Sequence, residues 1–131
     1  MVKNFEKNIE FPTAENCPMR NIVARFGNKW AMLILYIMYE EGTIRFRDII
    51  VRLPEISTKV LSKELKVLEE DGLIIRKAYA IVPPKVEYTL SARGASLIPI
   101  IVELYEWAKS NMQSIKADRV KYQSRNSTES C

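Results

Sequence analysis

Apolar residues recur along the first half of the chain at the three- and four-residue spacing that is typical of amphipathic helices. The spacing predicts three helices in succession, over residues 18–26, 28–42 and 45–53. We expect Asn28 to be the N-cap of the second helix, because its side chain accepts hydrogen bonds from free backbone N–H groups. Pro54 stops the third helix, since proline cannot continue one. The second helix is apolar on nearly every side, so we expect it at the centre of the fold.

A fourth helix, with a sharp turn before it, is predicted by the segment PEISTKVLSKELKVLEEDG. Ser57 or Thr58 can cap a helix that runs from residue 57 to about 70, and Gly72 suits the position after its end. The expected buried stripe consists of Val60, Leu61, Leu65 and Leu68. The connector PEI is three residues long. The third and fourth helices must therefore meet at a sharp angle, as in a helix-turn-helix unit.

The second half of the chain predicts a β-hairpin followed by a long apolar helix. Alternating β-branched and aromatic residues around VPPK indicate the hairpin over 73–90, in the place where a winged helix has its wing. Ser91 then caps a helix that we expect to end near Met112 and to kink at Pro99. Nine of the twelve positions between 97 and 108 are apolar. One buried stripe cannot use so many, so we expect a dimer interface on this helix.

These elements together predict a mostly α fold with a small β-hairpin (α+β), a winged helix-turn-helix that dimerises through its terminal helices. A length of 131 residues favours one domain. We divide the chain into an N-terminal arm over residues 1–16, a winged helix-turn-helix domain over 17–113 and a polar C-terminal tail over 114–131, which we expect to fray.

Composition excludes several kinds of protein. The chain has no histidine and only two cysteines, Cys17 and Cys131, so neither a zinc site nor a disulfide framework can be written, and we expect no metal and no cofactor. Without histidine or a glycine-rich phosphate loop, an enzyme is disfavoured. No apolar run reaches the roughly 18–20 residues of a membrane span, and the first residues are too charged for a signal peptide. We therefore expect a cytoplasmic protein with no membrane partner.

The placement of charge points to nucleic acid more than its amount does. A net charge of +4, from 20 basic and 16 acidic residues, permits such a partner without requiring one. On the fourth helix, however, ammonium and hydroxyl groups share the face opposite the apolar stripe. They belong to Ser57, Thr58, Lys59, Ser62, Lys63 and Lys66. Such groups contact phosphates and base edges when a helix enters the major groove, although a solvated face is the ordinary alternative.

Four further basic residues are candidates for DNA contact. Lys85 lies at the hairpin tip and Lys77 on its first strand, where they can meet phosphates or the adjacent minor groove. Arg45 and Lys29 lie near the starts of the third and second helices as candidate phosphate clamps. Solubility and protection of the strand edges are the alternative roles of the hairpin lysines.

Several strings, in this order, resemble the HxlR-type branch of the MarR-like winged helix regulators. They are CPMRNIVARFGNKWAMLIL, RFRDI, LPEISTKVLSKELKVLEEDGLI, VPPKVEYTLSARG and LIPIIVELYEWA. The resemblance implies a homodimeric transcriptional regulator, a repressor by expectation, that binds pseudo-palindromic operator DNA. It also implies a recognition helix from residue 57 to about 70 and a wing centred on 83–85. A winged-helix module for protein interaction or assembly, without specific DNA binding, is the alternative.

Cys17 is the remaining candidate. Some members of that family use the equivalent cysteine as a thiol sensor of oxidants, quinones or aldehydes. Pro18 suits the first helical position, which makes Cys17 the N-cap, and a helix N-terminus favours a thiolate, although Glu15 opposes it. A structural cysteine packed under the N-terminal arm is the alternative, and control by a small-molecule effector is also open.

Overall fold

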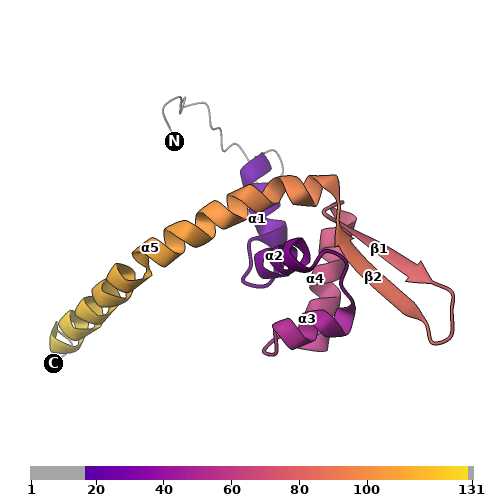
Figure 1. Ribbon diagram of the computed structural model, residues 1–131. Helices are drawn as coiled ribbons and strands as arrows, with labels where there is room; N and C mark the ends of the chain where they lie inside the picture. Colours follow the sequence, from indigo (N-terminus) through magenta and orange to yellow (C-terminus); the bar gives the residue numbers. More distant parts are fainter. Residues whose placement is uncertain (1–16, 130–131) are drawn as a thin grey trace. The chain divides into compact units, whose positions relative to one another are not determined.

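The structure of the protein is a computed structural model, and it describes residues 17–129. Five α-helices and one antiparallel β-hairpin follow one another in these residues (Figure 1). The elements are α1 (Pro18–Phe26), α2 (Ala31–Glu41), α3 (Phe46–Arg52), α4 (Thr58–Glu70), β1 (Ile74–Tyr79), β2 (Lys85–Leu90) and α5 (Ala92–Glu129). The chain divides into two compact units after Ser96, within α5. The predicted α+β fold is confirmed, whereas the N-terminal arm and Cys131 lie outside the described residues.

Two helix starts follow the sequence prediction. Cys17 is the N-cap of α1, and Pro18 takes the first helical position, where the missing N–H costs no hydrogen bond. Ser57 is the N-cap of α4, and its Oγ accepts a hydrogen bond from the backbone N–H of Val60 at 3.1 Å. Helix α4 therefore begins where the sequence placed it.

The start of α2 differs from the prediction by a short turn. The helix begins at Ala31, and Asn28 lies before it. Asn28 Oδ1 accepts hydrogen bonds from the backbone N–H groups of Trp30 and Ala31, both at 2.9 Å. An asparagine that bonds the backbone two residues on forms a turn of its own. Asn28 thus satisfies the free N–H groups as expected, but through a turn that delays the first helical residue.

The core of the first unit surrounds α2, which contacts α3, α4 and β2 (Figure 1). The largest fully buried side chains belong to Ile34, Leu35, Met38, Ile49, Leu61, Leu68 and Cys17. The central position predicted for α2 is confirmed. On α4, Leu61, Leu65 and Leu68 are buried, but Val60 is only half-buried, at the edge of the stripe.

The hairpin gains a third, one-residue strand that the sequence pattern did not predict. β1 and β2 pair antiparallel, with Tyr79 opposite Lys85 near the tip. Ile44, just before α3, exchanges two backbone hydrogen bonds with Tyr88 of β2, at 2.9 and 2.8 Å. A single extended residue carries no alternation from which a strand could be recognised. This bridge fixes the base of the hairpin to the start of α3.

The junction between α4, the hairpin and α5 depends on a glycine and a serine. Gly72 follows α4 with a φ of +71°, a conformation that favours glycine. Ser91 Oγ donates a hydrogen bond to the Gly72 carbonyl at 2.6 Å and accepts one from the Gly94 N–H at 3.0 Å. Ser91 therefore caps α5, as predicted, and at the same time holds the end of β2 against the end of α4.

The C-terminal tail is helical, so the expectation that residues 114–131 fray was wrong for its described part. α5 does not end near Met112 but continues to Glu129. The added residues include alanine, glutamine, lysine and arginine but neither glycine nor proline, which explains why the helix continues. Within residues 17–129, no helix is long and apolar enough to cross a membrane.

Candidate nucleic-acid interface

One side of α4 is buried and the opposite side carries the predicted polar set. The buried residues are Leu61, Leu65 and Leu68, together with Glu64. The exposed residues are Ser57, Thr58, Lys59, Ser62, Lys63 and Lys66. The structure thus brings all six α4 candidates together on a surface that is open to a ligand.

The three lysines of α4 are not neutralised by neighbouring acids. Within residues 17–129, Lys59, Lys63 and Lys66 form no ion pair. Glu64 lies on the same helix, but its side chain is buried and accepts a hydrogen bond from Asn28 Nδ2 at 2.9 Å. The exposed face of α4 therefore keeps its positive charge.

The acids at the C-terminal end of α4 are engaged by α1. The Arg25 guanidinium donates to both oxygens of Asp71, at 3.1 and 2.9 Å, and to Glu70 at 3.3 Å. The hydrogen bond to Asp71 is the main cause of a raised pKa of Arg25, with Coulomb attraction to the same carboxylate next. The contacts of Arg25 and Asn28 with α4 and its C-cap were not predicted, because their partners lie more than 30 positions away in the sequence.

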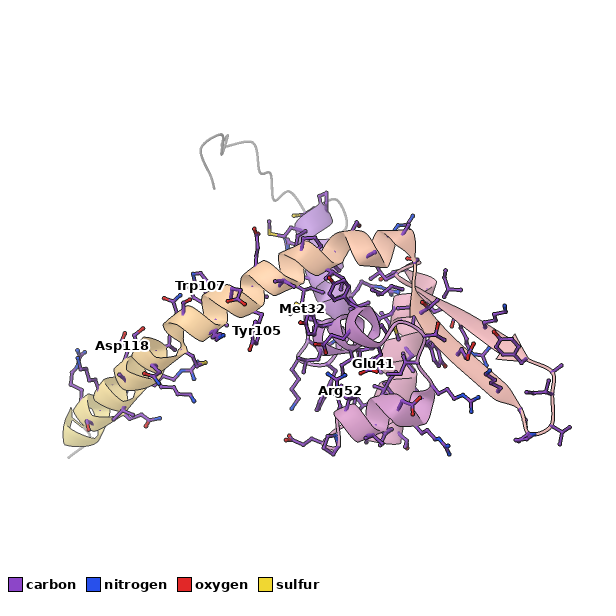
Figure 2. The ribbon with its side chains drawn as sticks, viewed as in Figure 1. Met32, Glu41, Arg52, Tyr105, Trp107 and Asp118 are labelled. Atoms are coloured by element: carbon purple, nitrogen blue, oxygen red, sulfur yellow. The ribbon has the colours of Figure 1, made fainter. Side chains whose placement is uncertain are left out.

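The helix before the turn is fixed in the same manner. Arg52 of α3 pairs with Glu40 at 2.7 Å and Glu41 at 2.8 Å, both at the end of α2, and Figure 2 shows Arg52 and Glu41 facing each other. The hydrogen bond to Glu40 is the main cause of the raised pKa of Arg52. Arg45, in contrast, is exposed and is the N-cap of α3, where its backbone N–H donates to Asp48 at 3.2 Å.

The hairpin lysines are restrained, unlike those of α4. Lys85 Nζ lies 4.9 Å from the centre of the Tyr79 ring and 3.3 Å from a carboxylate oxygen of Glu87. Lys77 Nζ lies 5.1 Å from the centre of the same ring. Tyr79 and Glu87 were not predicted, although their positions opposite Lys85 and Lys77 follow from the hairpin register. Lys29 is exposed, with its ammonium 4.8 Å from the centre of the Trp30 ring.

Cys17 is buried within the described fold. Its side chain is 1% exposed, and its sulfur forms no capping hydrogen bond at the start of α1. The expected place of Cys17 at the helix start is thus confirmed, but its thiol is not presented to solvent. In the part of the chain that the structure describes, no group of three or more His, Cys, Asp or Glu residues could hold a metal ion.

A short turn between α3 and α4, an exposed basic face on α4 and a hairpin directly after it define a winged helix-turn-helix protein of the transcription-regulator class. Residues 25–116 match the model of the HxlR-like helix-turn-helix family. The chain belongs to this family, so the recognition made from its sequence strings is confirmed.

Individual relatives agree with this assignment. The chain is 41% identical over 100 residues to "Uncharacterized HTH-type transcriptional regulator BH0655" of Halalkalibacterium halodurans, which covers 76% of this chain and 88% of that one. It is similar to the solved structure of "Putative transcriptional regulator ytfH from Salmonella typhimurium", with a TM-score of 0.72, 35% identity and coverage of 81% and 94%. These names describe regulators rather than enzymes.

One similar structure is that of a redox protein. "Redox regulator HypR in its oxidized form" matches with a TM-score of 0.67 and 38% identity, over 72% of this chain and 97% of that one. The words "redox regulator" describe HypR itself. For the present chain, the contacts of the individual candidate residues with DNA stay predictions.

Proposed function

We propose that this protein is a repressor that binds a pseudo-palindromic operator as a homodimer, with α4 in the major groove and the hairpin on the adjacent backbone or minor groove. The observation that carries the proposal is the exposed face of α4, where three lysines lie beside three hydroxyl groups and form no ion pair with any described acid. Phosphates attract free ammonium groups. Base edges can accept hydrogen bonds from hydroxyl groups and can also donate hydrogen bonds to them.

The side chains of α4 divide into two roles in this proposal. Lys59, Lys63 and Lys66 are placed as phosphate contacts, for which lysine serves as a point charge. Thr58 and Ser62 carry the hydroxyl groups that are free to meet base edges, whereas the Ser57 oxygen already accepts the capping hydrogen bond. Sequence preference then rests on few direct contacts, so we expect the shape of the operator to contribute to it.

Exposed apolar side chains on α5 support the homodimer. Ile100, Leu104, Tyr105 and Trp107 are each about half exposed or more, and Figure 2 shows Tyr105 and Trp107 projecting from the helix. Large apolar residues gathered on one segment mark an interaction surface. A two-fold dimer would place two α4 helices on half-sites about 34–36 Å apart, one turn of DNA.

DNA binding by the purified full chain tests the proposal. We expect a mobility shift with DNA from the region upstream of its own gene at lower protein concentration than with random DNA of equal length. Affinity should fall steeply with salt, because each neutralised phosphate releases counterions. The K59A/K63A variant should bind at least tenfold more weakly, while K109A/K116A on α5, with the same charge change, should bind like the wild type.

The opposite result has a clear meaning. A chain that forms a dimer in analytical ultracentrifugation but does not prefer upstream DNA over random DNA would be an interaction or assembly module. Absence of binding at low salt would contradict a DNA-binding role altogether, since the phosphate term acts without regard to sequence.

Control by oxidation at Cys17 is the second part of the proposal, supported by the similarity to HypR and by the place of this residue at the start of α1. Because the thiol is buried, an oxidant reaches it only when the start of α1 opens, and oxidation would keep it open. We expect diamide, which oxidises two thiols to a disulfide, or benzoquinone, which adds to a single thiol, to release wild-type protein from DNA and to leave the C17S variant bound. Equal release of both would make Cys17 a structural residue and leave a small-molecule effector as the remaining form of control.

A further inference from the structure

Four polar side chains gather on one face of the hairpin. Lys77 and Tyr79 alternate along β1, and Lys85 and Glu87 alternate along β2. The strand register pairs Lys77 with Glu87 and Tyr79 with Lys85. Because directly opposed residues and their second neighbours point to the same side of a sheet, all four side chains share one surface. We call these four residues the wing cluster.

Tyr79 is the centre of the wing cluster. Its ring lies within 4.9 Å of the Lys85 ammonium and 5.1 Å of the Lys77 ammonium, measured to the ring centre. Its hydroxyl group donates a hydrogen bond of 2.9 Å to Glu87 Oε1. The other carboxylate oxygen of Glu87, Oε2, lies 3.3 Å from Lys85 Nζ. Tyr79 therefore touches both cations and the anion that lies between the strands.

We propose that Tyr79 is a positioning residue that holds Lys77 and Lys85 as a preformed phosphate site, and that Glu87 is an internal counterion which a DNA phosphate replaces at Lys85. This inference rests on the proposed function, because its ligand is the phosphate backbone beside the groove that α4 enters. Tyr79 thus keeps the side chains of Lys77 and Lys85 in place, and Glu87 balances their charge.

The ring of Tyr79 explains how two flexible side chains are ordered without losing their donors. An unrestrained lysine gives up rotamer freedom when it binds, and this lowers affinity. A cation over an aromatic ring is already restrained. The ring does not use up the ammonium N–H groups, which can still form conventional hydrogen bonds with oxygen atoms. The ammonium N–H groups of Lys77 thus stay available to a phosphate.

Glu87 explains how the two ammonium groups are held over one ring. Like charges repel, and the carboxylate beside Lys85 offsets the repulsion in the free protein. The hydrogen bond from the Tyr79 hydroxyl group is the main cause that holds the pKa of Glu87 below its ordinary value. Lys85 has a smaller effect in the same direction, and the charge of Arg45 lowers the pKa further. Its neighbours therefore favour the ionised form of Glu87, and the Ile44–Tyr88 bridge places Arg45 next to Glu87 in the strand register.

Two substitutions with opposite effects test the inference. E87Q removes the counterion and leaves the lysines over the ring, so affinity for upstream DNA should rise about three- to tenfold and the salt slope should steepen by about one. Y79L removes the ring and the hydroxyl group together, so affinity should fall about three- to tenfold because the lysines lose their order. Y79F keeps the ring and should stay within about twofold of the wild type.

Matched controls separate this role from general damage. D118N on α5 makes the same charge change as E87Q outside the hairpin, and Y122L removes an exposed tyrosine of α5. Both should bind DNA like the wild type. Thermal unfolding of Y79L should remain cooperative, which would show that the variant is folded. If the wing cluster had only a structural role, E87Q would not bind DNA more tightly than the wild type.

The possible outcomes are distinct. Tighter binding by E87Q together with weaker binding by Y79L supports the inference. If the wild type binds DNA while E87Q binds equally or more weakly, the counterion role is wrong; if Y79L binds as the wild type does, the positioning role is wrong. If the wild type binds no DNA at low salt, the proposed function fails first, and this inference fails with it.

Discussion

Helix α4 and the hairpin both present lysines, but they hold them in different ways. On α4, Lys59, Lys63 and Lys66 form no ion pair within the described residues, and the helix below them is fixed by a buried side and a cap. On the hairpin, the lysines lie over Tyr79, and most residues of β1 are exposed while those of β2 are mostly half-buried. The packed backbone of α4 positions its lysines without contacts between side chains. The hairpin is less buried, so contacts between side chains keep its lysines in place.

The largest difference between α4 and the hairpin should appear in stability measurements. Leu61 is completely buried under the basic face of α4, so L61A should lower the free energy of unfolding by about 2–5 kcal/mol. Val82 at the hairpin tip is 99% exposed, so V82A should change it by less than about 0.5 kcal/mol. Urea denaturation measures both. Similar losses for the two variants would remove the contrast between a supported helix and an unsupported hairpin tip.

A polar contact should matter nearly as much for the placement of α4. In N28A, buried Glu64 loses its hydrogen-bond donor and the turn before α2 loses its acceptor, so we expect a loss of about 1–3 kcal/mol of unfolding free energy. E64Q, which still accepts from Asn28, should lose less. If the effects of N28A and E64A simply add in the double variant, the two side chains do not act as a pair.

The cap of α4 should contribute a smaller amount. In S57A the Val60 N–H loses its acceptor, which should cost about 0.5–2 kcal/mol of unfolding free energy. S62A, at an exposed position one turn along the same helix, serves as the matched control and should stay within about 0.5 kcal/mol of the wild type. Equal losses in thermal or urea unfolding would show that the start of the helix is held by something other than its cap.

The smallest effect concerns the charge of Glu87 on the hairpin. Its lowered pKa means that the ionised form stabilises the hairpin at neutral pH, and this contribution is lost as the pH falls through the pKa of the folded state. Removing the Tyr79 hydroxyl group in Y79F should raise the pKa of Glu87 toward its ordinary value of about 4.3. A carbon NMR titration of the Glu87 carboxyl group measures the shift, and Y39F on α2 should leave it unchanged.

Local signals accounted for most of the fold. Pro54 and Ser57 mark the turn and the start of α4, and the apolar spacing separates its buried side from its basic side, so both the element and the six-residue candidate set could be predicted. The end of α5 could not, because polar residues with good helix propensity resemble a disordered tail in composition. Lack of glycine and proline was the signal that would have corrected this.

Contacts between distant residues were beyond the sequence pattern. Arg25 bonds to Asp71, which is 46 positions away in the sequence, and Asn28 bonds to Glu64, which is 36 positions away. No spacing rule connects such pairs. The wing cluster was closer to prediction, since Tyr79 and Lys85 oppose each other once the hairpin register is known. Register was the missing quantity, because the five-residue loop between the strands does not fix it uniquely.

The salt dependence of DNA binding by two double variants tests the difference between the two surfaces most directly. K59A/K63A removes two free cations from α4, so the slope of log affinity against log salt should become shallower by about two. K77A/K85A removes two cations of which one is balanced by Glu87, so its slope should change by only about one. Equal changes in the two variants, or no change in K59A/K63A, would contradict this account.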